Sequence, residues 1–138
     1  MKLLLSASAF AIPFMLSGCS SGEHLKAAEQ EVAHFHQMLD AGQFERIYKE
    51  ASPDFRKAAP QEKFAEFAGA VHRKLGRVRT AERQGFNVNY GTGGTQVTLS
   101  YQTQFANGPA VETFVYRSSD AGAKLVGYNI DSDVFVIR

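Results

Sequence analysis

The chain has 138 residues with a formal net charge of +1, and 44% of its residues are hydrophobic, including 11 phenylalanines. The near-neutral charge argues against a general electrostatic attraction to nucleic acid, and the apolar content argues against a disordered tail or a coiled coil. The chain holds a single cysteine, so it can form no internal disulfide and packing alone must hold the fold. We therefore expect one compact domain.

The amino end carries an apolar segment. Lys2 precedes an apolar run over residues 3–16, and small and polar residues follow it. A transmembrane helix needs roughly 20 apolar residues, so this run is too short to span a bilayer. The arrangement is typical of a secretory signal, and we expect residues 1–18 to be removed from the mature protein.

The residues Leu16-Ser17-Gly18-Cys19 resemble the lipobox of bacterial lipoprotein signals, in which the cysteine thiol receives a diacylglyceryl group before cleavage. The resemblance implies that Cys19 is lipidated and becomes the first mature residue. The alternatives are an ordinary secretory signal with an incidental cysteine, or a buried thiol. Several acyl chains on one protein form a stable anchor, because each buried methylene adds about 0.8 kcal/mol to membrane binding.

This resemblance also predicts where the protein is held. We expect residues 19–23 to form the lipidated cysteine and a short tether, and residues 24–138 to form the domain in the bacterial cell envelope. Ser20 resembles the pattern of lipoproteins sent to the outer membrane, facing the periplasm, whereas an aspartate there would indicate the inner membrane.

The first half of the domain has a helical period. Apolar residues recur at steps of three and four over residues 24–40, 44–51 and 60–75. Glycines follow the first and third of these segments and are suited to end a helix. Ser52-Pro53-Asp54 stops the second segment. The sequence therefore predicts three helices.

The second half changes to a period of two, which is typical of strands. Turn residues separate four alternating segments, and a fifth segment at the carboxyl end could extend the sheet. The predicted strands cover residues 86–90, 97–105, 111–117 and 125–130, with 134–137 as the extension. The sequence therefore predicts an antiparallel meander.

Helices followed by strands imply an α+β domain in which three helices cover one face of a curved four-stranded antiparallel sheet. This order, with the phrases at residues 39–44 (LDAGQF), 75–76 (LG) and 125–130 (LVGYNI), is similar to the cystatin-like or nuclear transport factor 2-like cone and to uncharacterised families of small bacterial envelope proteins. The resemblance implies a sheet that curls around a pocket, which relatives use for acid–base chemistry or for ligand binding. It carries over no site residue.

His36 is the first candidate for acid–base chemistry. It lies at the border of the apolar stripe of its helix, whereas His34 points away from the stripe. Asp40 follows one turn later, and a carboxylate at this spacing could orient the imidazole and raise its basicity. The alternative, which we favour, is a helix-surface pair worth about 0.2–0.5 kcal/mol.

Glu112 is the second candidate, because it shares a strand face with Phe114 and Tyr116. If that face is the inner one, the carboxylate lies in an aromatic hollow with a raised pKa. If the face is the outer one, which we favour, Glu112 is solvated beside Arg117 or a cross-strand partner. The aromatic residues that could line the pocket, or simply form the core, are Tyr48, Tyr101, Phe114, Tyr116 and Tyr128.

A run of basic residues is the one charge asymmetry, with Glu82 as the only acid among Arg73, Lys74, Arg77, Arg79 and Arg83. On a tethered protein such a patch could contact anionic headgroups, at about 1 kcal/mol for each basic residue, or an acidic partner. The alternative, which we favour, is that the first two complement the end of the third helix and the others solvate a strand edge.

Two hypotheses about function remain. The chain has no phosphate-binding loop, no paired cysteines and no nucleophile elbow, and His34 and His36 lie on nearly opposite helix faces, so we expect no cofactor and no metal. The first hypothesis is a lipid-anchored, non-enzymatic envelope module that binds a small ligand or a protein partner. The second is a small hydrolase, dehydratase or isomerase that uses His36 with Asp40 or Glu112. We favour the first, because the predicted pocket face is mainly apolar.

Overall fold

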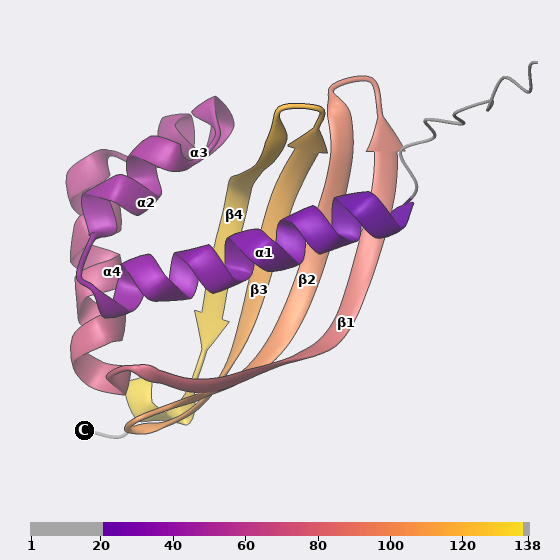
Figure 1. Ribbon diagram of the computed structural model, residues 1–138. Helices are drawn as coiled ribbons and strands as arrows, with labels where there is room; N and C mark the ends of the chain where they lie inside the picture. Colours follow the sequence, from indigo (N-terminus) through magenta and orange to yellow (C-terminus); the bar gives the residue numbers. More distant parts are fainter. Residues whose placement is uncertain (1–20, 137–138) are drawn as a thin grey trace, which may run out of the picture.

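The computed structural model describes residues 21–136, in which four α-helices precede four strands (Figure 1). The α+β class is therefore confirmed. The signal segment and Cys19 lie outside the described residues, so their roles stay predictions. The elements are α1 Ser21–Asp40, α2 Phe44–Glu50, α3 Pro53–Ala58, α4 Gln61–Leu75, β1 Val78–Gly91, β2 Gly94–Phe105, β3 Gly108–Ser119, β4 Gly122–Asp131 and the short 3-10 helix η1 Asp133–Phe135.

The helices number four within this range, so the prediction of three was wrong. Ser52 ends the α2 segment as expected, but it also caps α3, because its side chain accepts a hydrogen bond of 3.1 Å from the Phe55 backbone N–H. Pro53 then occupies the first turn, where its missing N–H removes no helical hydrogen bond. The first helix also begins earlier than expected, at Ser21, so residues 21–23 of the predicted tether are helical.

The four strands form one open antiparallel sheet in the order β1-β2-β3-β4, so each strand pairs with the next along the chain. All four are longer than the alternation predicted. β1 differs most, because it begins at Val78 and two register shifts interrupt its alternation. The expected extension at 134–137 is not a strand where it is described, since residues 133–135 form η1.

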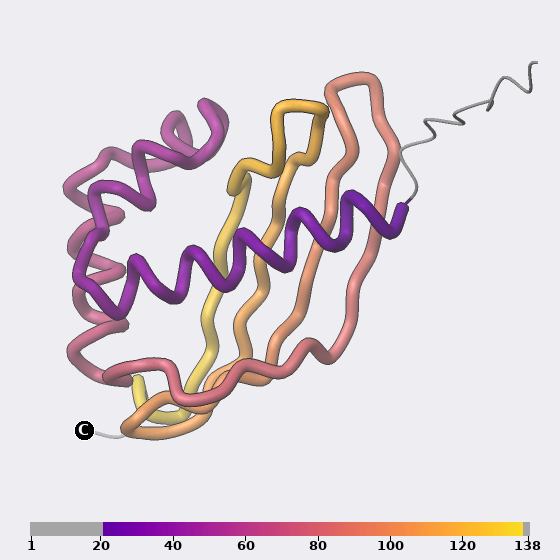
Figure 2. Tube along the Cα trace, viewed as in Figure 1, coloured from indigo at the N-terminus to yellow at the C-terminus, as the bar shows by residue number. Residues whose placement is uncertain are grey.

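Helix α1 crosses one face of the sheet and contacts all four strands, while α2, α3 and α4 gather at one end (Figures 1 and 2). Its apolar stripe includes Val32, Phe35 and Leu39, which are buried against alternate residues of β2 and β3. Phe114 lies at the centre, fully buried, with its ring centroid 5.2 Å from that of Phe35. Side chains therefore fill the inner face of the middle strands. No helix within residues 21–136 has both the length and the apolar character required to cross a bilayer.

Candidate functional site

A hydrogen-bonded network lies inside the core around Glu112, whose side chain is 0% exposed. Its Oε2 atom lies 2.7 Å from His36 Nε2 and accepts a hydrogen bond of 2.6 Å from the Thr103 hydroxyl. Its Oε1 atom accepts a hydrogen bond of 2.6 Å from the Tyr128 hydroxyl. We call these four residues the Glu112 network. Four separate elements supply them, α1, β2, β3 and β4.

The outer position that we favoured for Glu112 is therefore wrong. The strand register places Glu112 on the face of buried Phe114 and opposite buried Tyr101. Burying a carboxylate is costly unless hydrogen bonds replace its hydration. The His36 ring and the hydroxyls of Thr103 and Tyr128 supply these bonds, which makes the inner position stable.

The predicted pairing of His36 with Asp40 is also wrong. His36 is buried and directs its ring at Glu112, while Asp40 Oδ1 accepts a hydrogen bond of 3.1 Å from the Val78 backbone N–H. Asp40 therefore fixes the start of β1, and it does not orient the imidazole. His36 faces the sheet because α1 packs with a stripe wide enough to include it.

The chemistry open to the Glu112 network is limited by access. Burial, and then the adjacent Glu112 carboxylate, raise the pKa of Tyr128 well above its usual range, so this hydroxyl remains a donor. Glu112 and Thr103 are both fully buried. A general acid or base must lie within hydrogen-bond reach of its substrate. The arrangement therefore supports a stabilising role for the network inside the core.

Tyr128 is the member of the network that reaches a cavity. Its half-buried side chain lines a pocket of about 270 Å³ between α3, α4 and β4, together with Phe55, Phe64 and Phe67. The Phe67 and Tyr128 ring centroids are 6.1 Å apart. This apolar pocket offers burial to a hydrophobic group but few polar contacts.

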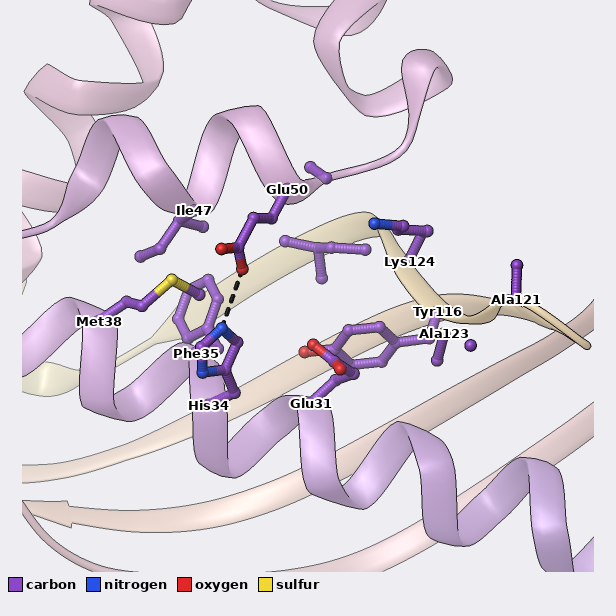
Figure 3. A pocket seen from close by; sticks show the side chains of 13 residues that line it. Glu31, His34, Phe35, Met38, Ile47, Glu50, Tyr116, Ala121, Ala123 and Lys124 are labelled. Carbon is purple, nitrogen blue, oxygen red and sulfur yellow. Dashed lines mark hydrogen bonds and ion pairs between the residues drawn. The ribbon is translucent and has the colours of Figure 1, made fainter.

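A second, more polar cavity of about 170 Å³ lies between α1, α2 and the β3–β4 hairpin, and we call it the hairpin cleft (Figure 3). Glu31 and His34 come from α1, Glu50 from α2, and Tyr116 and Lys124 from the hairpin. His34 Nε2 lies 2.9 Å from Glu50 Oε2, a contact that joins the two helices (Figure 3). Polar groups from three parts of the fold therefore surround one small cavity.

The charges of the cleft are set by its contacts. Burial opposes ionisation of Glu50, but hydrogen bonds from Arg46, at 2.8 Å, and from His34 outweigh it and lower the pKa of Glu50 below its ordinary value. Glu50 is therefore ionised at neutral pH. His34 points away from the core stripe of α1, but its contact with Glu50 holds it at the cleft.

Tyr116 is the unusual residue of the cleft. It is only 2% exposed, yet its hydroxyl has no hydrogen-bond partner among the described protein atoms. Burial, and then the Glu31 carboxylate, raise the pKa of Tyr116 well above its usual range, so the group is a neutral hydroxyl. An unpaired buried hydroxyl costs about 1–3 kcal/mol, and such groups are rare in folded proteins.

The other aromatic candidates are structural. The Tyr48 hydroxyl lies 2.8 Å from the backbone oxygen of Arg56 and 2.7 Å from that of Ala59, shares its one proton between them, and so holds α3 against α2. Tyr101 is buried with its ring centroid 5.9 Å from that of Phe114. The sequence pattern did not indicate Thr103 as a site residue, although its alternation with Tyr101 marked it as a residue of the same strand face. It also did not indicate Glu31, Glu50 and Lys124 of the hairpin cleft, which lie on separate elements and share no motif.

The five basic residues of the predicted patch do not form one continuous surface. Arg73 and Lys74 lie in the last turn of α4, where they complement the negative end of the helix. Arg83 lies further along β1, where its Nη1 atom is 2.6 Å from Glu29 Oε1. Arg77 and Arg79 are exposed near the start of β1. The structure thus separates Arg83 from the other four residues.

Within residues 21–136, no group of three or more His, Cys, Asp or Glu side chains could hold a metal ion.

The chain thus forms a small α+β domain in which one long helix crosses an open antiparallel sheet of four strands, and the domain contains two polar sites. Residues 31–128 match the family described as a protein of unknown function, DUF4019, and the chain belongs to this family. A solved structure of a protein from Catenulispora acidiphila is similar, with a TM-score of 0.51 and 16% identity over 81% of this chain and 93% of that chain. Similarity at this identity concerns the fold alone. No curated protein matches the chain.

Proposed function

We propose that this chain is a lipid-anchored bacterial envelope protein, facing the periplasm, whose domain binds a small polar ligand or a polar group of a partner protein without catalysis. The hairpin cleft is the proposed binding site. The observation that carries the proposal is Tyr116, a residue that lines the cleft and whose buried hydroxyl has no hydrogen-bond partner in the described protein. A ligand that forms a hydrogen bond with this hydroxyl would give it a partner. The free energy of binding would then include the cost that the unpaired hydroxyl imposes on the free protein.

The anchor part of the proposal rests on the sequence around Cys19. The apolar run, its short length and the small residues before the cysteine support lipidation, and Ser20 supports the outer membrane. We also propose that the domain is a cystatin-like or nuclear transport factor 2-like cone. The order of helices and strands, and the long helix across the inner face of the sheet, support this assignment.

The charges around the cleft narrow the ligand class. Glu31 favours a ligand with an ammonium or guanidinium group, since both oxygens of Glu50 already contact Arg46 and His34, and Lys124 on the opposite wall favours an acidic group on the same ligand. A cavity of about 170 Å³ suits a compact molecule or a single side chain of a partner. We therefore propose a small zwitterionic or cationic ligand.

The enzymatic alternative is less well supported. It needs His36 or Glu112 in contact with a substrate, but both oxygens of Glu112 already accept hydrogen bonds inside the core. Tyr128 also lies between Glu112 and the apolar pocket, so a substrate there would meet the tyrosine ring first. A general base usually requires converging polar groups that the substrate can reach.

The ligand proposal can be tested by thermal unfolding in the presence of small zwitterions and cations. A ligand at 100 times its Kd stabilises the folded state by about 2.7 kcal/mol, which raises Tm measurably. We expect Tyr116→Phe to abolish the ligand-induced rise in Tm. The matched control is Tyr90→Phe, which removes a tyrosine hydroxyl from a side chain that is 65% exposed and lies outside the cleft.

Two outcomes would contradict the proposal. A ligand whose effect on Tm survives Tyr116→Phe binds somewhere other than the cleft. An activity that Glu112→Gln abolishes while the far-ultraviolet circular dichroism stays unchanged would support the enzymatic alternative. Lipidation is tested separately by the mass of the N-terminal peptide, with Cys19→Ser as the control.

A further inference from the structure

Two large aromatic side chains are exposed on β1. Phe86 is 55% exposed and Tyr90 is 65% exposed. Their partners on β2 are Leu99 and Thr95, which are both buried, and directly paired residues lie on the same face of a sheet. The two aromatic residues therefore belong to the inner face of the sheet, in the part of β1 that α1 covers incompletely.

The first turn of α1 is held beside this exposed region. His24 Nδ1 lies 2.8 Å from the Ser118 hydroxyl, and the His24 ring packs edge-on against Tyr90, with centroids 6.3 Å apart. Arg83 lies over the Phe86 ring at 4.9 Å from its centroid. We call the surface formed by His24, Phe86 and Tyr90 the aromatic face.

The proposed anchor lies very close to this surface. Cys19 is two positions before Ser21, the first residue of α1. An extended chain spans at most about 3.6 Å per residue, so a lipid on Cys19 would be tied to the start of α1 by at most about 7 Å of chain. Because α1 begins at Ser21, only residues 19 and 20 of the predicted tether precede the helix. A membrane anchor at Cys19 holds the first turn of α1, and with it the aromatic face, at the bilayer surface.

We infer that the aromatic face rests on the bilayer that holds the chain, with Phe86 and Tyr90 among the lipid headgroups. The inference rests on the proposed lipidation of Cys19. Tyrosine suits this position, because its ring is apolar and its hydroxyl stays hydrated, and aromatic residues are enriched at membrane interfaces. Arg83, next to Phe86, is paired with Glu29, so the two aromatic rings provide the contact with the headgroups. The domain is therefore fixed in one orientation on the membrane.

The test uses the full chain in its lipidated form. The sequence contains no tryptophan, so Tyr90→Trp introduces a single fluorescent reporter into the aromatic face. The protein is reconstituted into vesicles of phosphatidylethanolamine and phosphatidylglycerol, with and without a lipid that carries a nitroxide quencher at the headgroup. We expect the emission of Tyr90→Trp to shift to shorter wavelength in the vesicles and to be lost when the quencher is present.

Val111→Trp is the matched control. Val111 is 43% exposed on β3, on the sheet face opposite to Glu112, and its emission should show neither the shift nor the loss. Phe86→Trp repeats the measurement at a second position, so that a folding defect of one variant, seen by circular dichroism, does not decide the result.

Flotation of the vesicles measures the anchor independently. Protein that floats with the vesicles while both reporters in the aromatic face remain unquenched would overturn the inference and leave the anchor intact. Protein that does not float would overturn the anchor together with the inference. An emission shift without quenching, accompanied by a dimer in chemical cross-linking, would show that a second copy covers the face, which also overturns the inference.

Discussion

Replacing Glu112 by glutamine tests whether the buried network stabilises the fold. The change keeps the shape of the side chain and removes the charge from a group that forms three hydrogen bonds of 2.6–2.7 Å. A hydrogen bond to a charged group contributes about 1.5–3 kcal/mol, and a neutral one about 0.5–1.5 kcal/mol. A loss of about 1 kcal/mol in each of the three bonds lowers the free energy of unfolding by about 3 kcal/mol.

The loss is measured by urea unfolding of the mature chain. With an m value of about 2 kcal/mol/M, a loss of about 3 kcal/mol lowers the midpoint by about 1.5 M urea. Thr103→Val removes one donor to the Glu112 carboxylate and keeps the volume, so it should lower the free energy of unfolding by about 1.5–3 kcal/mol. Glu45→Gln is the matched control, since Glu45 is exposed and lies 3.9 Å from Lys49, and its free energy of unfolding should change by less than about 0.5 kcal/mol, which is less than about 0.25 M in the urea midpoint. A midpoint of Glu112→Gln as high as that of the control would refute the reasoning.

Three further predictions concern pH, a helix cap and a turn. The raised pKa of Tyr128 contributes stability that is present below about pH 10, the unfolded value, and is lost as pH rises further, so Tyr128→Phe should flatten the alkaline part of an unfolding profile. Ser52→Ala removes the cap of α3 and should cost about 1 kcal/mol in urea unfolding. Gly108→Ala should cost about 1–3 kcal/mol, because Gly108 has φ +151° and an added Cβ would lie 2.7 Å from a Val134 methyl, whereas Gly85→Ala meets no atom within 4 Å and serves as the control.

The helices and the middle strands could be predicted because one face of each is buried. The stripe of Val32, Phe35 and Leu39 has the helical period, and the alternation of β2 from Val97 to Phe105 has the strand period. β1 was predicted too short for the opposite reason. It is an edge strand with no fully buried residue and with two register shifts, so its sequence carries little alternation.

The position of Glu112 could not be read from the sequence, because alternation identifies the residues that share a face but not the direction of that face. Phe114 and Tyr116 on the same face favoured the inner side, while the charge of Glu112 favoured the outer side. Glu112 can lie on the inner side because His36, Thr103 and Tyr128 contact its carboxylate there. These residues lie on other elements of the fold. Only the tertiary structure brings them together.

Helix α1 connects the two polar sites. Its residues His34 and His36 point in different directions, so that one contacts Glu50 at the hairpin cleft and the other contacts Glu112 in the core. The contact to Glu112 fixes the rotation of α1 about its axis, and this rotation sets where Glu31 and His34 stand relative to Tyr116. A buried, unpaired Tyr116 hydroxyl costs the free protein about 1–3 kcal/mol, which is comparable to what the Glu112 network is expected to contribute. The network can therefore offset the cost of keeping a polar group ready in the cleft, which is the pattern expected where stability is given up for binding.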